Sequence, residues 1–176
     1  NLGGLAEARE GAARTSASSV YLRVGQTISA GLVVGGDLFR GVNGKAGQIG
    51  HITLDENGPV CRCSNRGCLE TYAGGPALLS LFAPDGGFRR LGDLVQAAEL
   101  GDGRARRVIA DAGKHLGIAA ASLTNLFDPE AIVVGGELAR AGEILLAPMR
   151  HALERAALSA SGELPEIVEY SFGEGT

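Results

Sequence analysis

The sequence of 176 residues lacks tryptophan, and aromatic residues make up only 5% of it. It has no apolar run near the roughly 20 residues that a membrane-spanning helix needs, and no signal peptide opens it. Its net charge is −4, and its densest basic group, Arg104, Arg106 and Arg107, is typical of a solvated helix start. These absences exclude a basic nucleic-acid-binding surface, and we expect no membrane contact and a cytoplasmic location.

Cysteine is also scarce, and all three cysteines lie within eight residues, as Cys61, Cys63 and Cys68. An odd, tightly clustered set is a poor disulfide framework but a reasonable metal framework. The segment HITLDENGPVCRCSNRGCLE adds His51 as a fourth ligand, and turn signals at 57–59 allow it to meet the thiols. Four Cys and His ligands favour zinc in a closed, structural site, and thiolates disfavour magnesium and calcium. The alternatives are an incidental or redox cysteine group and an ordinary hydrogen-bonded His51.

Glycine is abundant, with 28 residues, while 45% of the sequence is hydrophobic and 20% is charged. This composition predicts one globular domain rich in tight turns. Residues 2–12 are predicted as a short helix, and 41–50 as a glycine-rich loop. β-branched runs predict strands at 20–24, 28–34 and 37–40, with the first ones antiparallel, followed by short strands at 51–54, 131–134 and 166–171.

The remaining apolar periodicity predicts helices at 68–72, 76–82, 91–100, 104–127 and 142–158. The longest of them repeats apolar residues every three or four positions, namely Val108, Ile109, Ala112, Leu116, Ala119, Ala120, Leu123 and Leu126, and Asp128-Pro129 ends it. The pattern is that of an α/β domain with an antiparallel opening.

Two motifs carry a resemblance to a known family. GKAGQIGH at 44–51, followed by CRCSNRGCLE at 61–70, resembles the ROK family of sugar kinases and sugar-responsive transcriptional repressors. The resemblance implies an actin-like, ribonuclease H-like ATPase-type fold, a mixed sheet with flanking helices. It also implies that residues 1–176 form most of the second, C-terminal domain of a ROK-type protein, with the zinc loop at 51–70 and the first domain absent.

The resemblance assigns roles to individual residues. It implies zinc ligation by His51, Cys61, Cys63 and Cys68, and sugar binding by Glu70, His51, Gln48 and Asn1. The alternative for Glu70 is a carboxylate that only favours a helix N-terminus. By the same resemblance, Gly135 and Gly136 would lie on the adenosine side of the family's cleft. An ordinary strand-to-helix turn explains these two glycines equally well. The family's catalytic aspartate falls two positions before Asn1, so this chain holds no catalytic residue.

Three departures from the family pattern affect the expected function. Gln48 replaces a sugar-binding glutamate, and Ser64 replaces a glycine, which is tolerable if its φ is not positive. Residues 25–31 (GQTISAG) replace a glycine-rich phosphate loop. We expect Gln26 and Ile28 to crowd an incoming phosphate, which argues against efficient use of ATP.

The favoured interpretation is therefore the sugar-sensing domain of a ROK-type regulator with a structural zinc. It would contact DNA only through a helix-turn-helix domain outside this chain. The first alternative is a glucokinase-like sugar kinase that uses ATP and magnesium. The second is a zinc-stabilised assembly domain without a ligand. A homo-oligomer is expected from the family resemblance.

Overall fold

The computed structural model describes residues 16–158 and 163–170. The helix predicted for 2–12 lies outside them, as do Asn1 and the last residue of the strand predicted at 166–171. Five strands form one mixed sheet: β1 (Ser18–Val24), β2 (Ile28–Val34), β3 (Asp37–Phe39), β4 (Ala131–Gly135) and β5 (Glu166–Glu169). Their order is β3-β2-β1-β4-β5.

The direction of the strands follows from their connections. β1, β2 and β3 are joined by tight turns and pair antiparallel. β4 pairs parallel with β1, and β5 parallel with β4, because helices connect them. The positive φ values of Gly35 and Gly36, 61° and 82°, suit the two-residue turn between β2 and β3. The predicted antiparallel opening and the mixed sheet are confirmed.

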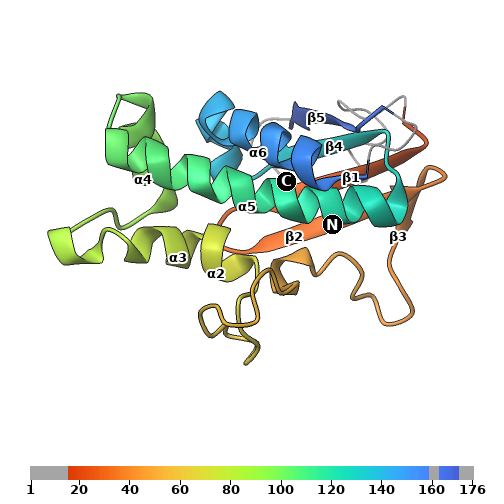
Figure 1. Cartoon of the computed structure of the whole chain (residues 1–176), viewed down its shortest axis with the longest axis horizontal. Helices are drawn as coiled ribbons and strands as arrows, with labels where there is room; N and C mark the ends of the chain where they lie inside the picture. Colours follow the sequence, from red (N-terminus) through yellow and green to blue (C-terminus); the bar gives the residue numbers. More distant parts are fainter. Residues whose placement is uncertain (1–15, 159–162, 171–176) are drawn as a thin grey trace.

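The helices lie mainly on one face of the sheet (Figure 1). They are α2 (Glu70–Ala73), α3 (Gly75–Ser80), α4 (Leu91–Glu99), α5 (Gly103–Phe127) and α6 (Glu143–Ala156), with short 3-10 turns η1 (Ile49–His51), η2 (Ala83–Asp85) and η3 (Glu137–Ala141). Asp102 caps α5 by accepting hydrogen bonds from the N–H groups of Arg104 and Ala105, at 2.9 and 2.8 Å.

The main core lies between this helical layer and the sheet. Strand residues such as Leu22, Ile132 and Val134 are fully buried there against Leu116 and Met149. α5 and α6 approach each other closely at Gly117, because glycine has no side chain there. A side chain at this position would meet the backbone of Met149. The helix predicted at 104–127 is confirmed as α5, but Leu126 of its apolar repeat is 76% exposed and does not belong to the core.

A second expectation is also wrong: residues 51–54 do not form a strand. The chain instead turns through η1, with Ile49 and Gly50 buried, and Thr53 makes an isolated bridge with Cys68. Gly47 is the reason, because its φ of 87° sets its carbonyl to accept a 2.7 Å hydrogen bond from Ala30 of β2. The loop is thereby anchored beside β2, and the chain continues as the turn η1.

Candidate metal and ligand site

The cysteine motif lies on an excursion of the chain between η1 and α2, below β2 in Figure 1. Its backbone folds back on itself, since Leu54 N–H donates to Gly67 at 2.8 Å and Gly67 N–H to Pro59 at 2.8 Å. A tight turn follows within the motif, where Cys61 N–H donates to Asn65 at 2.7 Å and Ser64 N–H to Cys61 at 2.9 Å. Together these turns bring His51 and the three cysteines around one point.

The four predicted metal ligands meet at that point. Their ligand atoms all lie within 4.8 Å of one another. Cys61 Sγ lies 3.6 Å from His51 Nδ1, and Cys63 Sγ lies 3.6 Å from Cys68 Sγ. Zinc–sulfur bonds of about 2.3 Å in a tetrahedron give a sulfur–sulfur edge of about 3.8 Å, so the cluster fits a tetrahedral ion. The three thiols are not joined in disulfides.

The thiols differ in their environment. Burial raises the pKa of Cys68 to about 12, because the charged form is desolvated. A hydrogen bond from the backbone N–H of Asn65 lowers the pKa of Cys63, which is exposed. Without an ion, Cys68 therefore stays protonated at neutral pH. A bound cation would favour its thiolate, as metal binding displaces thiol protons.

The turn holds one strained residue. Ser64 has a φ of 74°, a left-handed conformation that a side chain disfavours. The condition under which serine in place of glycine would be tolerated without strain, a φ that is not positive, is therefore not met. The tight reversal between Cys63 and Cys68 requires the conformation, and serine adopts it where the family pattern has glycine.

Glu70, the predicted sugar ligand, is the first residue of α2 and follows the last cysteine by two positions. Its Oε2 accepts a 3.0 Å hydrogen bond from the backbone N–H of Ile28, and its Oε1 pairs with Arg62 Nε at 2.7 Å. Gly50 lies against it, with space for no side chain between Ile28 and Glu70. The side chain of Glu70 is 10% exposed. Its contacts with the β1–β2 hairpin, with η1 and with the zinc loop at 51–70 together hold the carboxylate in place.

The other predicted site residues fall into two groups. Gln48 directly precedes η1, where its carbonyl accepts a 3.0 Å hydrogen bond from His51 N–H, and the residue is exposed. Gly135 and Gly136 lie at the carboxyl end of β4. A side chain at Gly136, whose φ is 97°, would strike the carbonyl of Val24. Packing thus accounts for this glycine whether or not a nucleotide binds.

In the β1–β2 turn at 25–27, only one of the two side chains expected to crowd a phosphate is exposed. Ile28 is only 3% exposed and belongs to the core, so the expectation that it crowds a phosphate is wrong. It lies on the buried side of β2, and only its N–H faces the site. Gln26 is exposed at the tip, and its backbone and side chain pack against Gly75.

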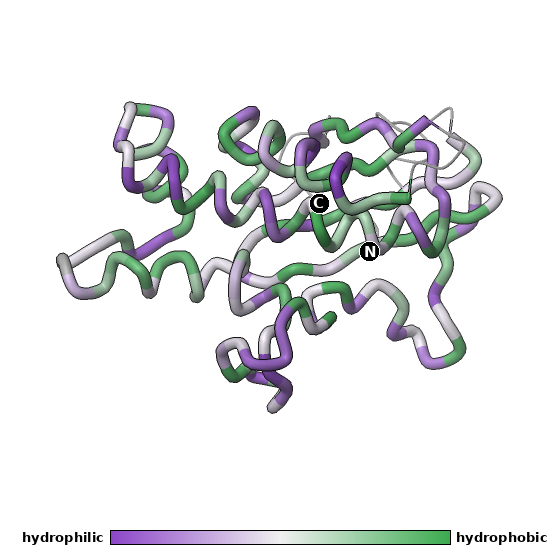
Figure 2. The backbone as a smooth tube through the Cα atoms, viewed as in Figure 1, coloured by the Kyte–Doolittle hydropathy of each residue, from purple (hydrophilic) through white to green (hydrophobic). Residues whose placement is uncertain are grey.

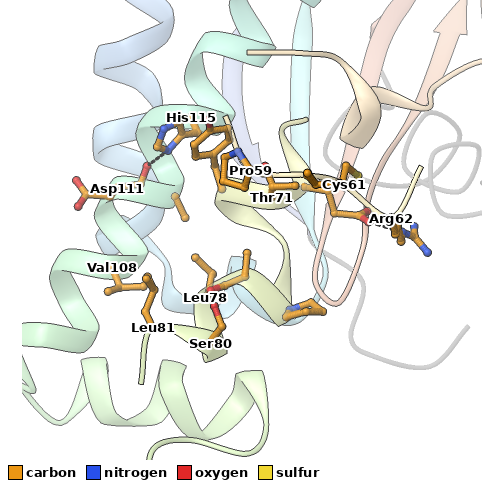
Figure 3. A pocket seen from close by; sticks show the side chains of 16 residues that line it. Pro59, Cys61, Arg62, Thr71, Leu78, Ser80, Leu81, Val108, Asp111 and His115 are labelled. Carbon is orange, nitrogen blue, oxygen red and sulfur yellow. Dashed lines mark hydrogen bonds and ion pairs between the residues drawn. The ribbon is translucent and has the colours of Figure 1, made fainter. Parts of the chain in front are cut away.

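Two contacts were missed by sequence reasoning. One is the ion pair of Arg62 with Glu70, eight residues apart, a spacing that no regular element brings together. The other is the stacking of Tyr72 on His115, whose ring centres are 4.7 Å apart. Both pairs line a cavity of about 660 Å³ between the metal loop, α2, α3 and α5 (Figure 3).

Comparison with known proteins identifies the family to which this fold and this motif belong. The ROK family model matches residues 1–175. The chain is 31% identical over 99% of its length to the xylose repressor of Bacillus subtilis strain 168, covering 45% of that protein. It is 34% identical over 90% of its length to a glucokinase of Halalkalibacterium halodurans, covering 53% of it. The chain thus spans about half the length of the curated relatives it matches.

Solved structures agree. A ROK hexokinase from Thermus thermophilus superposes with a TM-score of 0.83 at 35% identity, over 99% of this chain and 60% of that one. A ROK family transcriptional regulator, a homologue of the Escherichia coli MLC protein, superposes with a TM-score of 0.90 at 31% identity, over 98% and 46%. The chain belongs to the ROK family and has its actin-like fold.

Proposed function

We propose that this chain is the sugar-sensing domain of a ROK-family transcriptional regulator, stabilised by a structural zinc ion. The observation that carries the proposal is the position of Glu70. Its carboxylate is held by Ile28 N–H at the start of α2, directly beside the cluster of one imidazole and three thiols. A carboxylate fixed in this way can accept hydrogen bonds from adjacent sugar hydroxyls.

Zinc would be held by His51, Cys61, Cys63 and Cys68, and it would order the loop that carries them. That loop is largely hydrophilic (Figure 2). Of residues 52–68, only two glycines and two of the cysteines are buried, namely Gly58, Gly67, Cys61 and Cys68. A segment with so little apolar surface to bury needs another source of stability, and a four-ligand site supplies it.

The sugar would lie against Glu70, His51 and Gln48. His51 turns Nδ1 toward Cys61, so ligation through Nδ1 leaves Nε2–H as a hydrogen-bond donor of fixed direction. Gln48 offers both a donor and an acceptor at the preceding turn. Asn1, outside the described residues, is proposed as a further contact from the family pattern.

A regulator is favoured over a kinase by the β1–β2 turn. Gln26 places a side chain where the family's kinases have bare glycine, and exposed N–H groups are what phosphates require. The xylose repressor and the MLC homologue support the same choice. In such a protein DNA binding would reside in a helix-turn-helix domain before this one, in the cytoplasm, and the whole would act as a homo-oligomer.

The second candidate is an ATP-dependent sugar kinase, supported by the glucokinase and hexokinase relatives. ATP and magnesium would then bind near Gly135 and Gly136. The full-length reading frame and an assay separate the two. If the protein is a regulator, we expect a helix-turn-helix segment upstream in the reading frame. We also expect calorimetry to detect sugar binding and an assay to detect no phosphoryl transfer. ATP turnover with glucose or N-acetylated sugars at ordinary kinase rates, roughly 1–100 per second, would refute it.

A further inference from the structure

The side chain of Arg62 occupies one oxygen of the carboxylate that is proposed to contact the sugar. Arg62 Nε lies 2.7 Å from Glu70 Oε1. The other oxygen, Oε2, is already held by Ile28 N–H at 3.0 Å. Each carboxylate oxygen therefore has one partner and can accept a second hydrogen bond, and a ligand that approaches Oε1 meets Arg62 there.

The place of Arg62 is set by the metal loop. It lies between Cys61 and Cys63, and its neighbours on both sides are proposed ligands of one ion, so its backbone cannot move far. Its side chain is 63% exposed, while that of Glu70 is 10% exposed. Within residues 16–158 and 163–170, Glu70 is the one partner found for the guanidinium. Among these residues no hydrogen bond is found for the two terminal nitrogens of Arg62, so their N–H donors are available.

We propose that Arg62 is a specificity-determining residue that selects sugars bearing an acidic group, a carboxylate or a phosphate. The inference rests on the proposed sugar site at Glu70. A sugar hydroxyl that donates to Oε1 competes with the guanidinium for that oxygen and weakens its pairing with Glu70. An acidic group on the same ligand compensates for this loss through charge-assisted, bidentate hydrogen bonds to Arg62. A neutral sugar has nothing to offer it, so the pair discriminates against neutral sugars.

The surroundings provide room for such a group. Arg62 and Glu70 both line the cavity of about 660 Å³, a volume in the range of small-molecule sites. In Figure 3, Arg62 lies at one end of the row of lining side chains, and Asp111 and His115 lie at the other. Asp111 is paired with Lys114 at 2.8 Å. Arg62 is the one arginine among the residues that line this cavity, and no lysine lines it.

The test is the charge preference of the full-length, zinc-loaded protein, measured by calorimetry with matched ligands. The pairs are glucose with glucuronate and with glucose 6-phosphate, and N-acetylglucosamine with its 6-phosphate. We expect the wild type to prefer an acidic member about tenfold or more. In R62Q this preference should fall to about twofold or less, while R62K keeps part of it. The glucuronate and phosphate arms show which acid is preferred.

Arg66 provides the matched control. It is an exposed arginine of the same loop, and its Nη1 donates to the carbonyl of Gly58 rather than to a carboxylate. R66Q removes the same charge and should keep the preference, so an equal loss in R62Q and R66Q would show only a general charge effect and overturn the inference. Zinc content and melting temperature establish that both variants are folded. Equal wild-type affinity for neutral and acidic sugars would overturn this inference alone. Failure to bind any sugar would overturn the proposed function with it.

Discussion

The carboxylate of Glu70 accepts a 3.0 Å hydrogen bond from the backbone N–H of Ile28, which ties the first turn of α2 to the start of β2. This bond connects the metal loop, which ends at Cys68, to the hairpin of the central sheet. The carboxylate that follows the loop is therefore fixed relative to the sheet.

The Glu70→Gln variant should lose sugar affinity while it keeps its metal. Glutamine still offers an acceptor to Ile28 N–H, but the charge that strengthens hydrogen bonds from hydroxyls is gone. We expect sugar binding to weaken about tenfold or more, as measured by calorimetry, with one zinc per chain by elemental analysis. Glu56→Gln, at an exposed acid of the same loop, is the control. Unchanged affinity in Glu70→Gln would remove Glu70 from the site.

The Cys63→Ser variant should lose zinc and stability together. Cys63 is exposed, so its replacement disturbs little packing, and the loss of stability reports the metal. Zinc at a hundred times its dissociation constant contributes about 2.7 kcal/mol, and we expect a loss of at least that size in chemical unfolding. A chelator should bring the wild type to the level of the variant and leave the variant unchanged. Metal retained in Cys63→Ser at full stability would contradict the site.

The Ser64→Gly variant should be more stable than the wild type. Left-handed backbone at a φ of 74° is unfavourable by about 1–2 kcal/mol for a residue with a side chain. The added freedom of glycine in the unfolded chain offsets about 0.4–1 kcal/mol of that, so we expect a net gain near 0.5–1 kcal/mol. Ser64→Ala keeps Cβ and should show no gain. Denaturant unfolding of the zinc-loaded proteins measures both.

Gly117→Ala should destabilise the domain although alanine is the better helix former. Its Cβ would lie 2.6 Å from Ala152 Cβ and would also meet the Met149 backbone, which forces α5 and α6 apart. Overpacking of this kind is unfavourable by about 1–3 kcal/mol. Gly103→Ala, on the exposed start of the same helix, meets only the end of Arg107 at 3.5 Å and should be neutral or slightly stabilising. Equal effects of the two substitutions would contradict the close crossing.

The zinc-free protein should lose stability as pH rises from about 9 toward 12. Burial raises the pKa of Cys68 from 9.0 to about 12, so between these values the unfolded chain has lost a proton that the folded chain keeps, and unfolding is favoured. The pKa of Tyr72 is also raised by burial and acts in the same direction. Urea unfolding at pH 8 and pH 10.5 measures the change. Zinc-loaded protein, in which the thiolate is bound, should show less of this loss, and a flat profile without zinc would contradict the prediction.

Local patterns were enough to predict most elements and the metal ligands. The β-branched runs and the three-to-four-residue apolar repeat gave the strands and α5, because alternation and helical period are properties of neighbouring residues. The cysteine spacing gave the cluster for the same reason, since one short loop supplies three of its four ligands. The strand predicted at 51–54 is absent because Gly47 accepts a hydrogen bond from Ala30 of β2, a long-range contact that no local pattern contains.

The amino-acid sequence by itself determined the family, the order of helices and strands, and the set of one histidine and three cysteines that can hold an ion. Only the tertiary structure decided that Ser64 is strained, that Ile28 turns its side chain into the core and its N–H to Glu70, and that Arg62 faces the same carboxylate. The physical reason is range: ligand spacing and helical period are set within a few residues, whereas a carboxylate acquires its partners from whichever segments the packed core brings beside it.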